Sequence, residues 1–306
     1  MSDPFGTRAI ILGAVAVAAC MAMVQPAARG AVIVNETFAD GDRTTDNPPG
    51  SLQWTYGAHH GSSAFTSLNA GDGALLWDHT TSGGTKSFSA IWGHFADAGT
   101  PLTLAVGDSL SLTFDVSFSN GTLVNSTNSF RWALLDSNNS RVTSDFAGNN
   151  ATGIANGSTF GAWRGYGAGT AVFGSNTTGN NLVSRQRTGT GTGLYTSADW
   201  GDFSAVNEPL FALNTTYAGY LTLMRTATGV EVQAGINGAS TLLVTDTVAP
   251  FVEFDTISFF VTDASNTDLT LDNIQLTYVP VPEPASVLSL LVLAGGLLGR
   301  RLRPRA

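Results

Sequence analysis

The chain has 306 residues, of which 43% are apolar and only 12% are charged, and its formal net charge is −9. Its single cysteine excludes a disulfide framework and a zinc module built on several cysteines. With 14 basic residues against 23 acidic ones, the chain is also a poor partner for nucleic acid. The apolar share is too high for a disordered tail, so we expect one large folded domain, or at most two.

The N-terminal segment has the layout of a secretory signal. A weakly basic start precedes an apolar run over residues 9–24, and the small residues Ala28 and Gly30 precede the expected cleavage point. We therefore predict that residues 1–30 are a signal peptide. The alternative is a lipoprotein signal, because the residues that end at Cys20 resemble a lipobox. The apolar run continues beyond Cys20, which favours the ordinary signal.

Residues 31–280 are predicted to form strands throughout. The clearest case is Ser109–Ser119, where Leu, Phe and Val alternate with Ser, Thr and Asp, as in an antiparallel strand with one buried face. Asn237 and Gly238 give a hairpin signal between two further runs. Without a long helical period in this region, we predict an all-β fold, a single antiparallel β-sandwich of the jelly-roll type. The other predicted strands are Ala31–Phe38, Ala74–Asp78, Phe88–Phe95, Phe130–Asp136, Tyr217–Arg225, Val230–Ile236, Thr241–Thr247, Ile257–Thr262 and Leu269–Tyr278.

Two glycine-rich stretches interrupt this pattern. Phe146–Gly169 and Gly174–Gly193 are rich in Gly, Asn, Ser and Thr, so we predict long surface loops, where a sandwich commonly carries its binding groups. Exposed aromatic rings there would stack on the apolar face of a sugar. The alternative is that these rings pack their own loops onto the sandwich. The predicted ligand-binding aromatic residues are Trp163, Tyr166, Tyr195 and Trp200.

Catalytic motifs are harder to find. The sequence has no Gly-x-Ser-x-Gly elbow, and its four histidines, within residues 59–94, lack the spacing of a helical zinc site. A sandwich enzyme places its acid–base carboxylates by the fold, and Asp115, Asp136 and Glu231 are the ones on predicted strands. The sequence favours a protein that is not an enzyme. Four tryptophans on or beside predicted strands are expected in the core: Trp54, Trp77, Trp92 and Trp132.

The two ends of the central region resemble a known family. Val32–Asp42, followed by Trp54, resembles the opening strand of carbohydrate-binding jelly rolls, and Leu269–Leu276 is similar to their last strand. The resemblance implies that the first and last strands are neighbours. It also implies that a structural calcium ion often sits where these strands meet.

The last predicted strand changes phase at Asp272 and Asn273, because the apolar residues before and after this pair alternate in opposite phases. We predict a β-bulge there, which would turn Asp272 away from the ladder. Calcium prefers several oxygen ligands, which acidic side chains supply. We therefore predict a structural calcium site, with a solvated acidic turn as the alternative. Its candidate ligands are Glu36, Asp40, Asp42 and Asp272.

The C-terminal segment, residues 281–306, has a Pro-Glu-Pro motif at residues 282–284, an apolar run over residues 285–299 and an arginine-rich tail. A helix of that length rises only about 22 Å, short of the roughly 30 Å hydrocarbon core, so we predict a marginal transmembrane helix with its tail in the cytoplasm. The arrangement resembles the PEP-CTERM sorting signal of bacterial surface proteins. That resemblance implies recognition by an exosortase, export across the inner membrane and removal of the tail. The sorting residues are Pro282, Glu283, Pro284, Arg300, Arg301 and Arg303.

Together these features support three hypotheses about function. The leading one is an exported surface or extracellular-matrix protein, transiently anchored in the inner membrane, whose non-catalytic sandwich binds exopolysaccharide or a surface glycan. The alternatives are a sandwich-fold polysaccharide hydrolase or lyase with two convergent carboxylates, and a self-assembling structural component. Without the two terminal segments the chain loses six arginines and two acidic residues, so the central domain is more acidic than the whole chain.

Overall fold

A computed structural model gives the three-dimensional structure of the chain. Gly30–Val279 form one compact unit. The predicted signal peptide and sorting segment lie outside the described residues, and among the residues that are described no helix is long and apolar enough to cross a membrane. The structure describes residues 30–59, 68–71, 73–77, 88–119, 130–148, 159–170, 180–189, 193–195, 199–208, 211–262 and 268–281.

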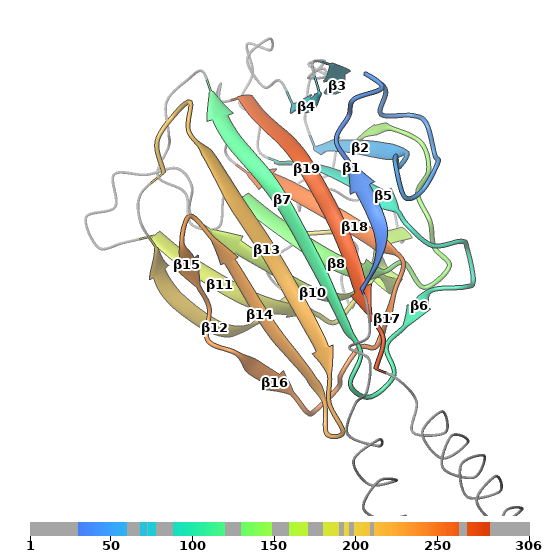
Figure 1. Ribbon diagram of the computed structural model, residues 1–306, viewed down its shortest axis with the longest axis vertical. Coiled ribbons are helices and arrows are strands. Elements are labelled where there is room, and N and C mark those ends of the chain that lie inside the picture. Colours follow the sequence, from blue (N-terminus) through green and yellow to red (C-terminus); the bar gives the residue numbers. More distant parts are fainter. Residues whose placement is uncertain are drawn as a thin grey trace, which may run out of the picture. The chain divides into compact units, whose positions relative to one another are not determined.

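The first layer is a nine-stranded antiparallel sheet, seen face-on in Figure 1. Its strands are, in chain order, β1 (Ala31–Glu36), β3 (Leu68–Gly71), β4 (Ala74–Trp77), β7 (Ser109–Ser119), β13 (Thr216–Arg225), β14 (Val230–Ile236), β15 (Ala239–Ser240), β16 (Val244–Asp246) and β19 (Asp268–Val279). They follow the spatial order β15-β14-β13-β7-β19-β4-β3, while β1 pairs with β19 and β16 pairs with β14. The first and last strands are therefore neighbours, as the resemblance to carbohydrate-binding jelly rolls implies.

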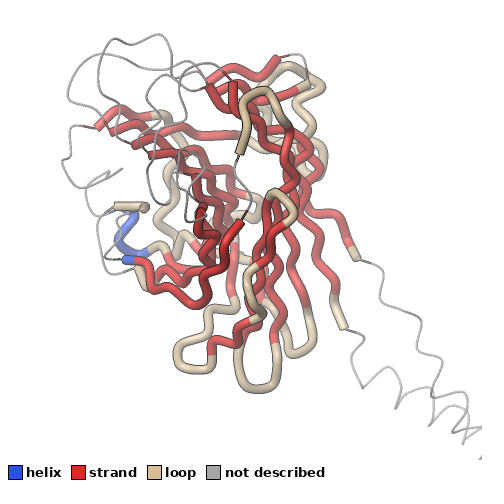
Figure 2. The backbone as a smooth tube through the Cα atoms, turned by 90° about the vertical axis from the view of Figure 1, so that its left-hand side faces the viewer, coloured by secondary structure: helices blue, strands red, loops and turns tan. Residues whose placement is uncertain are grey.

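The second layer is an eight-stranded sheet, and Figure 2 shows the two layers side by side. Its strands are β2 (Trp54–His59), β5 (Phe88–His94), β8 (Phe130–Asp136), β9 (Phe146–Gly148), β10 (Arg164–Thr170), β11 (Asn180–Arg187), β12 (Trp200–Glu208) and β18 (Thr256–Thr262). They follow the order β12-β11-β10-β8-β18-β5-β2-β9, antiparallel except between β2 and β9. Two short elements complete the described fold: the pair β6 (Leu102–Thr103) and β17 (Glu253–Phe254), and the 3-10 helix η1 (Thr159–Ala162).

The core lies between the two sheets. In β7 every apolar residue is buried and the polar residues between them are half-buried or exposed, because successive side chains of a strand point to opposite faces. Phe114 of β7 meets Phe259 of β18 edge-on, with ring centroids 5.0 Å apart, so aromatic contacts join the two layers. The predicted all-β sandwich is confirmed. The four tryptophans expected in the core are all fully buried: Trp54, Trp77, Trp92 and Trp132.

Two local predictions about turns and bulges are confirmed. Asn237 and Gly238, both with positive φ, close the hairpin between β14 and β15. In β19, Asp272 and Asn273 together oppose the single residue Asp115 of β7, and Asn273 takes a left-handed conformation with φ of 50°. The phase change in the sequence is therefore a β-bulge.

The prediction of two long surface loops is wrong in part. Phe146–Gly169 contains β9 and most of β10, and Gly174–Gly193 contains all of β11. The glycines of β10 serve close packing within the sheet. A Cβ atom at Gly167 would lie 2.7 Å from the carbonyl oxygen of Trp132 and 2.9 Å from the ring of Trp200. Only a residue without a side chain fits there, so glycine here marks a strand under a large ring.

Candidate functional site

A groove of about 430 Å³ lies on the face of the nine-stranded sheet that points away from the core. We call it the outer groove. Its lining residues come from β1, β7, β13 and β19, and its polar side chains all lie at outward-facing positions of their strands. The small residue Ala218 of β13 leaves room between the larger side chains, while Gly219 makes space for the core ring of Phe114. Its polar lining residues are Asn35, Thr113, Asp115, Tyr220, Asn273 and Gln275.

One wall of the outer groove is built by the bulge. The side-chain amide of Asn273 donates to Asp115 Oδ2 at 2.9 Å and to Asp272 Oδ2 at 3.3 Å. The backbone N–H of Asn273 donates to Asp272 Oδ1 at 2.6 Å. These contacts hold the two carboxylates on either side of one amide. The wall thus presents carboxylate and amide oxygens to solvent in a fixed arrangement, because β7 and β19 are paired here.

Tyr220 forms the opposite side of the groove. A Cβ atom at Gly235 would lie only 2.2 Å from Tyr220 Cε1, so the ring passes directly over the backbone of β14. Its hydroxyl donates to Ser240 Oγ of β15 at 2.7 Å. Held between these two strands, the half-buried ring forms a fixed apolar surface beside the polar wall.

The third part of the groove is a row of amides and hydroxyls. Gln275 Nε2 donates to Asn35 Oδ1 at 3.2 Å, which joins β19 to β1 across the sheet. Thr113 is the register partner of both Gln275 and Tyr220, so the row runs straight from β1 to β13. Because Asn and Gln side chains donate and accept, this row can bond to hydroxyl groups of a ligand in either sense.

The four aromatic residues predicted to bind sugar are buried, so they do not present exposed rings to a ligand. Trp163 is 0% exposed, meets Trp92 edge-on at 6.2 Å and donates its indole N–H to the Ser140 carbonyl at 2.7 Å. Tyr166 is also 0% exposed, and its hydroxyl donates to Asp246 Oδ2 at 2.8 Å. Hydrogen bonding to that carboxylate and burial both raise the pKa of Tyr166, with burial the larger cause. Neither ring is available to a ligand.

Tyr195 and Trp200 are buried in the same way, 4% and 8% exposed. Tyr195 stacks on Trp200 at 5.4 Å and on Phe260 of β18 at 4.4 Å. These rings belong to a second apolar cluster on the outer face of the eight-stranded sheet, separate from the core between the layers. The rings of Trp163, Tyr195 and Trp200 therefore cover the second sheet, whereas Tyr166 belongs to the core between the layers.

A buried arginine fastens this covering. The Arg187 guanidinium is 0% exposed and donates to the carbonyl oxygens of Leu194 at 3.0 Å, Phe160 at 2.8 Å, Gly193 at 2.8 Å and also Trp163. Burial lowers the pKa of Arg187 to about 10, so it stays protonated at neutral pH. One cation thus satisfies four carbonyl oxygens of the covering segments.

The predicted calcium ligands do not gather into a site. Glu36 points into the core and is 1% exposed, paired in register with buried Ile274. Its oxygens accept the backbone N–H groups of Phe38 at 2.8 Å and Leu52 at 2.9 Å, and side-chain donors as well. Because the protein itself satisfies this carboxylate, it is not free to bind a metal.

The other three predicted ligands lie elsewhere. Asp40 Oδ1 accepts the backbone N–H of Asp42, and hydrogen bonds from Thr44 lower the pKa of Asp42 to about 2, which makes this segment a local acidic turn. Asp272 lies on the outer face beside Asn273, opposite in direction to Glu36. Within the described ranges no three His, Cys, Asp or Glu side chains form a metal-binding group, so these residues do not fit calcium.

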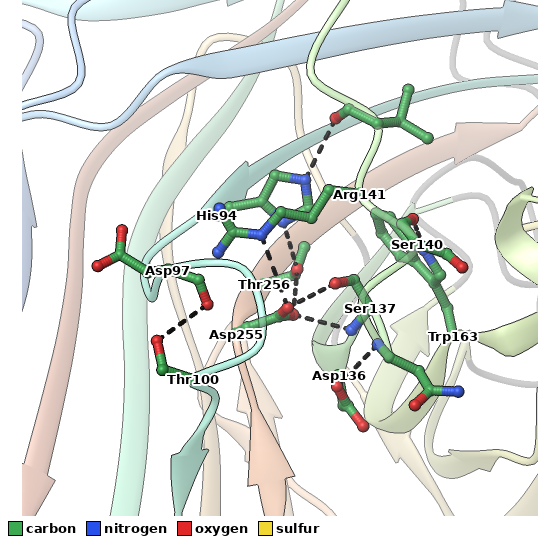
Figure 3. Close-up of polar contacts among 12 residues, drawn as sticks. His94, Asp97, Thr100, Asp136, Ser137, Ser140, Arg141, Trp163, Asp255 and Thr256 are labelled. Atoms are coloured by element: carbon green, nitrogen blue, oxygen red, sulfur yellow. Dashed lines mark hydrogen bonds and ion pairs between the residues drawn. The ribbon is translucent and has the colours of Figure 1, made fainter.

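A second polar cluster lies between β5 and β18 (Figure 3). Asp255 Oδ1 accepts from the Ser137 backbone at 2.8 Å and from the Thr256 hydroxyl at 2.6 Å. The His94 ring nitrogens lie 2.7 Å from Thr256 Oγ1 and 3.2 Å from the Val142 carbonyl oxygen. Burial lowers the pKa of His94 to about 4. The Ser137 hydroxyl donates to Asp255, and the Thr256 hydroxyl beside His94 is 0% exposed and also donates to Asp255, so these contacts fasten a turn.

The three carboxylates singled out for catalysis do not converge. Asp136 is 3% exposed and bonds to the Asn138 backbone and to Arg164, which makes it structural. Glu231 lies on the outer face of β14, in the register row of Ser109. Six residues of β7 separate that row from Asp115, which is about 20 Å at 3.3 Å per residue. Only Asp115 lies in the outer groove.

Sequence reasoning identified part of the groove and missed the rest. It singled out Asp115 on a strand and the phase change at Asp272 and Asn273. It missed Tyr220 and Gln275, although the alternation along β13 and β19 places both on a polar face. Alternation shows that Tyr220 and Gln275 lie on polar faces. It does not show that their strands both pair with β7, which is what brings the two residues into one groove.

Comparison with known proteins supports the fold. The structure is similar to the Emp46p carbohydrate recognition domain in its potassium-bound form, with a TM-score of 0.50 and 12% identity over 82% of this chain and 97% of that one. The metal-free form of that domain gives a TM-score of 0.49 at the same identity and coverage. A Bacillus subtilis protein with a galectin-like fold gives 0.44, with 12% identity over 74% and 90%. No family model and no curated protein matches the sequence. At such low identity the likeness shows a lectin-like sandwich fold and no more.

Proposed function

We propose that this protein is a non-catalytic polysaccharide-binding sandwich and that the outer groove is its binding site. The observation that carries the proposal is that the Tyr220 ring, held over β14, lines the same groove as the carboxylate and amide groups of Asp115 and Asn273. A sugar has hydroxyl groups at its edges and C–H groups on its ring faces. The groove offers a partner to each of these surfaces. The likeness in fold to a carbohydrate recognition domain agrees with this reading.

The groove also suits a polymer better than a single small molecule. It is open to solvent along the outer face of the sheet, so a chain can cross it without ending inside it. Its polar groups come from four strands of one sheet, which fixes their spacing before any ligand arrives. Preorganised contacts of this kind lose little conformational entropy on binding.

Export to the cell surface belongs to the same proposal. The support is the sequence alone: the signal-like residues 1–30 and the C-terminal segment that resembles a PEP-CTERM signal. Its expected partners are an exosortase and, before processing, the inner membrane. The test is fractionation of a tagged chain with and without residues 282–306. If both forms reach the cell surface equally well, the sorting role is wrong.

Binding is tested by affinity electrophoresis through gels that contain polysaccharides. Tyr220→Ala removes the ring, and Asn273→Gly removes the amide while keeping a residue that tolerates a positive φ. We expect each variant to lose at least about tenfold in affinity, or roughly 1.4 kcal/mol. Glu231→Gln is the matched control, because it changes another outer-face residue distant from the groove. Failure of every polysaccharide to retain the native protein would overturn the proposal.

A hydrolase or lyase is the second candidate, favoured by one observation. Asp115 and Asp272 both accept from the same Asn273 amide, so two carboxylates converge at the groove wall. Acid–base cleavage of a glycosidic bond uses such a pair. Release of oligosaccharides from a bound polymer, abolished by Asp115→Asn, would replace the non-catalytic proposal with this one. Ordered oligomers without glycan binding would favour a structural component instead.

A further inference from the structure

The outer groove has one charged lining residue, and that residue is acidic. Asp115 is the carboxylate, while the other polar lining side chains are neutral amides and hydroxyls. Its contact in the groove is the neutral amide of Asn273, which leaves its charge uncancelled. Asp272 adds a second negative charge at the bulge. A ligand in the groove therefore meets a negative potential.

Basic side chains in the described strands lie away from this face. Arg225 is the one basic residue on the described strands of the nine-stranded sheet, and it shares the inward phase of Leu221 and Leu223. The arginines of the eight-stranded sheet bond to carbonyl oxygens of the covering segments or to carboxylates: Arg131, Arg164, Arg185 and Arg187. The outer face of the first sheet also carries Glu231.

We propose that the outer groove selects neutral polysaccharide and rejects uronic-acid and sulfated polymers, with Asp115 as the residue that discriminates; this rests on the proposed function. A carboxylate accepts two hydroxyl hydrogens of a neutral sugar at once. An anionic sugar brings its own charge against Asp115 and offers no cation in exchange. Like charges juxtaposed in an interface disfavour that partner, which is how a site rejects the wrong ligand.

The test measures retention of the full chain by neutral polymers (dextran, mannan and laminarin) and by alginate and polygalacturonate. EDTA is present throughout, so that no divalent cation bridges two carboxylates. We expect retention by at least one neutral polymer and none by the uronates at low salt. Asp115→Asn keeps the size of the side chain and removes its charge. It should reduce the ratio of the affinity for neutral polymer to the affinity for uronate polymer by about tenfold or more. Glu231→Gln should leave this ratio unchanged.

Salt gives an independent measurement. If the rejection is electrostatic, the preference of the native protein should narrow as sodium chloride screens Asp115, and the preference of Asp115→Asn should not change. Native protein that binds a uronate polymer as tightly as any neutral one, or an Asp115→Asn variant with an unchanged preference, would overturn this inference and leave glycan binding intact. Lack of binding to all five polymers would overturn the proposed function itself.

Discussion

The outer faces of the two sheets differ in exposure: one is accessible to solvent and the other is covered by protein. On the nine-stranded sheet, β7 alternates between buried and accessible residues, and its polar side chains form part of an open groove. On the eight-stranded sheet, all seven residues of β8 are buried, because η1 and the residues around Tyr195 cover the second face. The outer side of β7 is thus accessible to water, whereas the outer side of β8 is covered by protein. A ligand can reach the first sheet, while the second is committed to packing.

Arginine and glycine make the covered face possible. Arg187 supplies donors to the carbonyls of the covering segments, and Gly167 leaves space for the Trp200 ring. On the open face the corresponding groups are hydroxyls and amides that water can satisfy. Substitutions should therefore destabilise the protein when they fall on the covered face, and change binding when they fall on the open one.

The largest effect is expected for Arg187→Met. The change removes the guanidinium donor from the carbonyls of Gly193 and Trp163 and one of two donors from those of Phe160 and Leu194, and each buried polar group left unpaired costs about 1–3 kcal/mol. We expect a loss of at least about 3 kcal/mol in the free energy of unfolding. Urea denaturation followed by tryptophan fluorescence measures it. Thr113→Ala on the open face is the control; equal losses for both would remove the contrast between the faces.

Acid should destabilise the covered side through His94. Burial lowers its pKa from 6.5 to about 4, so the unfolded chain binds the proton more readily than the folded one between these values. Stability should therefore fall as pH drops from about 6.5 towards 4, by roughly 2 to 3 kcal/mol. His94 faces Asp255, and Arg141 lies 4.0 Å from that carboxylate. Urea melts at pH 7 and pH 4.5 test this: His94→Gln should lose less stability on acidification than the native chain.

A smaller effect is expected for Gly235→Ala. The new methyl group would overlap Tyr220 Cε1 and force the ring off the sheet. Overpacking of this kind costs about 1–3 kcal/mol, and the displaced ring should also weaken glycan binding. Gly201→Ala on β12 is the matched control, since a Cβ atom there meets nothing within 4 Å. Thermal melting and gel retention of both variants give the comparison, and unchanged retention by Gly235→Ala would exclude Tyr220 as a fixed platform.

The smallest effect is expected for Ser111→Ala. The Ser111 hydroxyl lies 3.1 Å from Thr222 Oγ1 on the open face, where water can replace the bond, so the loss should stay within about 0.5 kcal/mol. The same substitution at Ser258 removes a buried hydroxyl that donates to the Ile91 carbonyl at 3.0 Å. It should cost about 1–2 kcal/mol. Calorimetry of both variants measures the two losses of stability. A larger loss for Ser111→Ala than for Ser258→Ala would contradict the contrast between the open and covered faces.

Alternation made most of the nine-stranded sheet predictable. Ser109–Ser119 and Val230–Ile236 are strands with the predicted bounds, because one buried face and one wet face produce a clear period of two. The bulge at Asp272 was predictable for the same reason, since an added residue shifts that period. A strand with one face accessible to water can therefore be recognised from the alternation in its sequence.

The covered sheet was less predictable, for a physical reason. β10 is buried on both faces and carries glycines for close packing, and most described side chains of β11 are buried as well, so neither strand shows alternation and the sequence predicts loops for both. The same reasoning placed the Trp163 ring on the surface. Burial of that ring depends on which segment folds over the sheet, and contacts between segments distant in the chain leave no local pattern in the sequence.

The bulged strand β19 connects the groove directly to the end of the folded unit, so it would transmit force between them. Asn273 and Gln275, which line the groove, belong to β19, and that strand ends at Val279 where the folded unit ends. A pull on a bound polymer, resisted beyond Val279, would run along one strand. β19 is bonded to β7 from Asp268 to Val279, and β1 flanks it on the other side. The load would therefore act in shear on two ladders at once, which resists rupture better than peeling hydrogen bonds one by one.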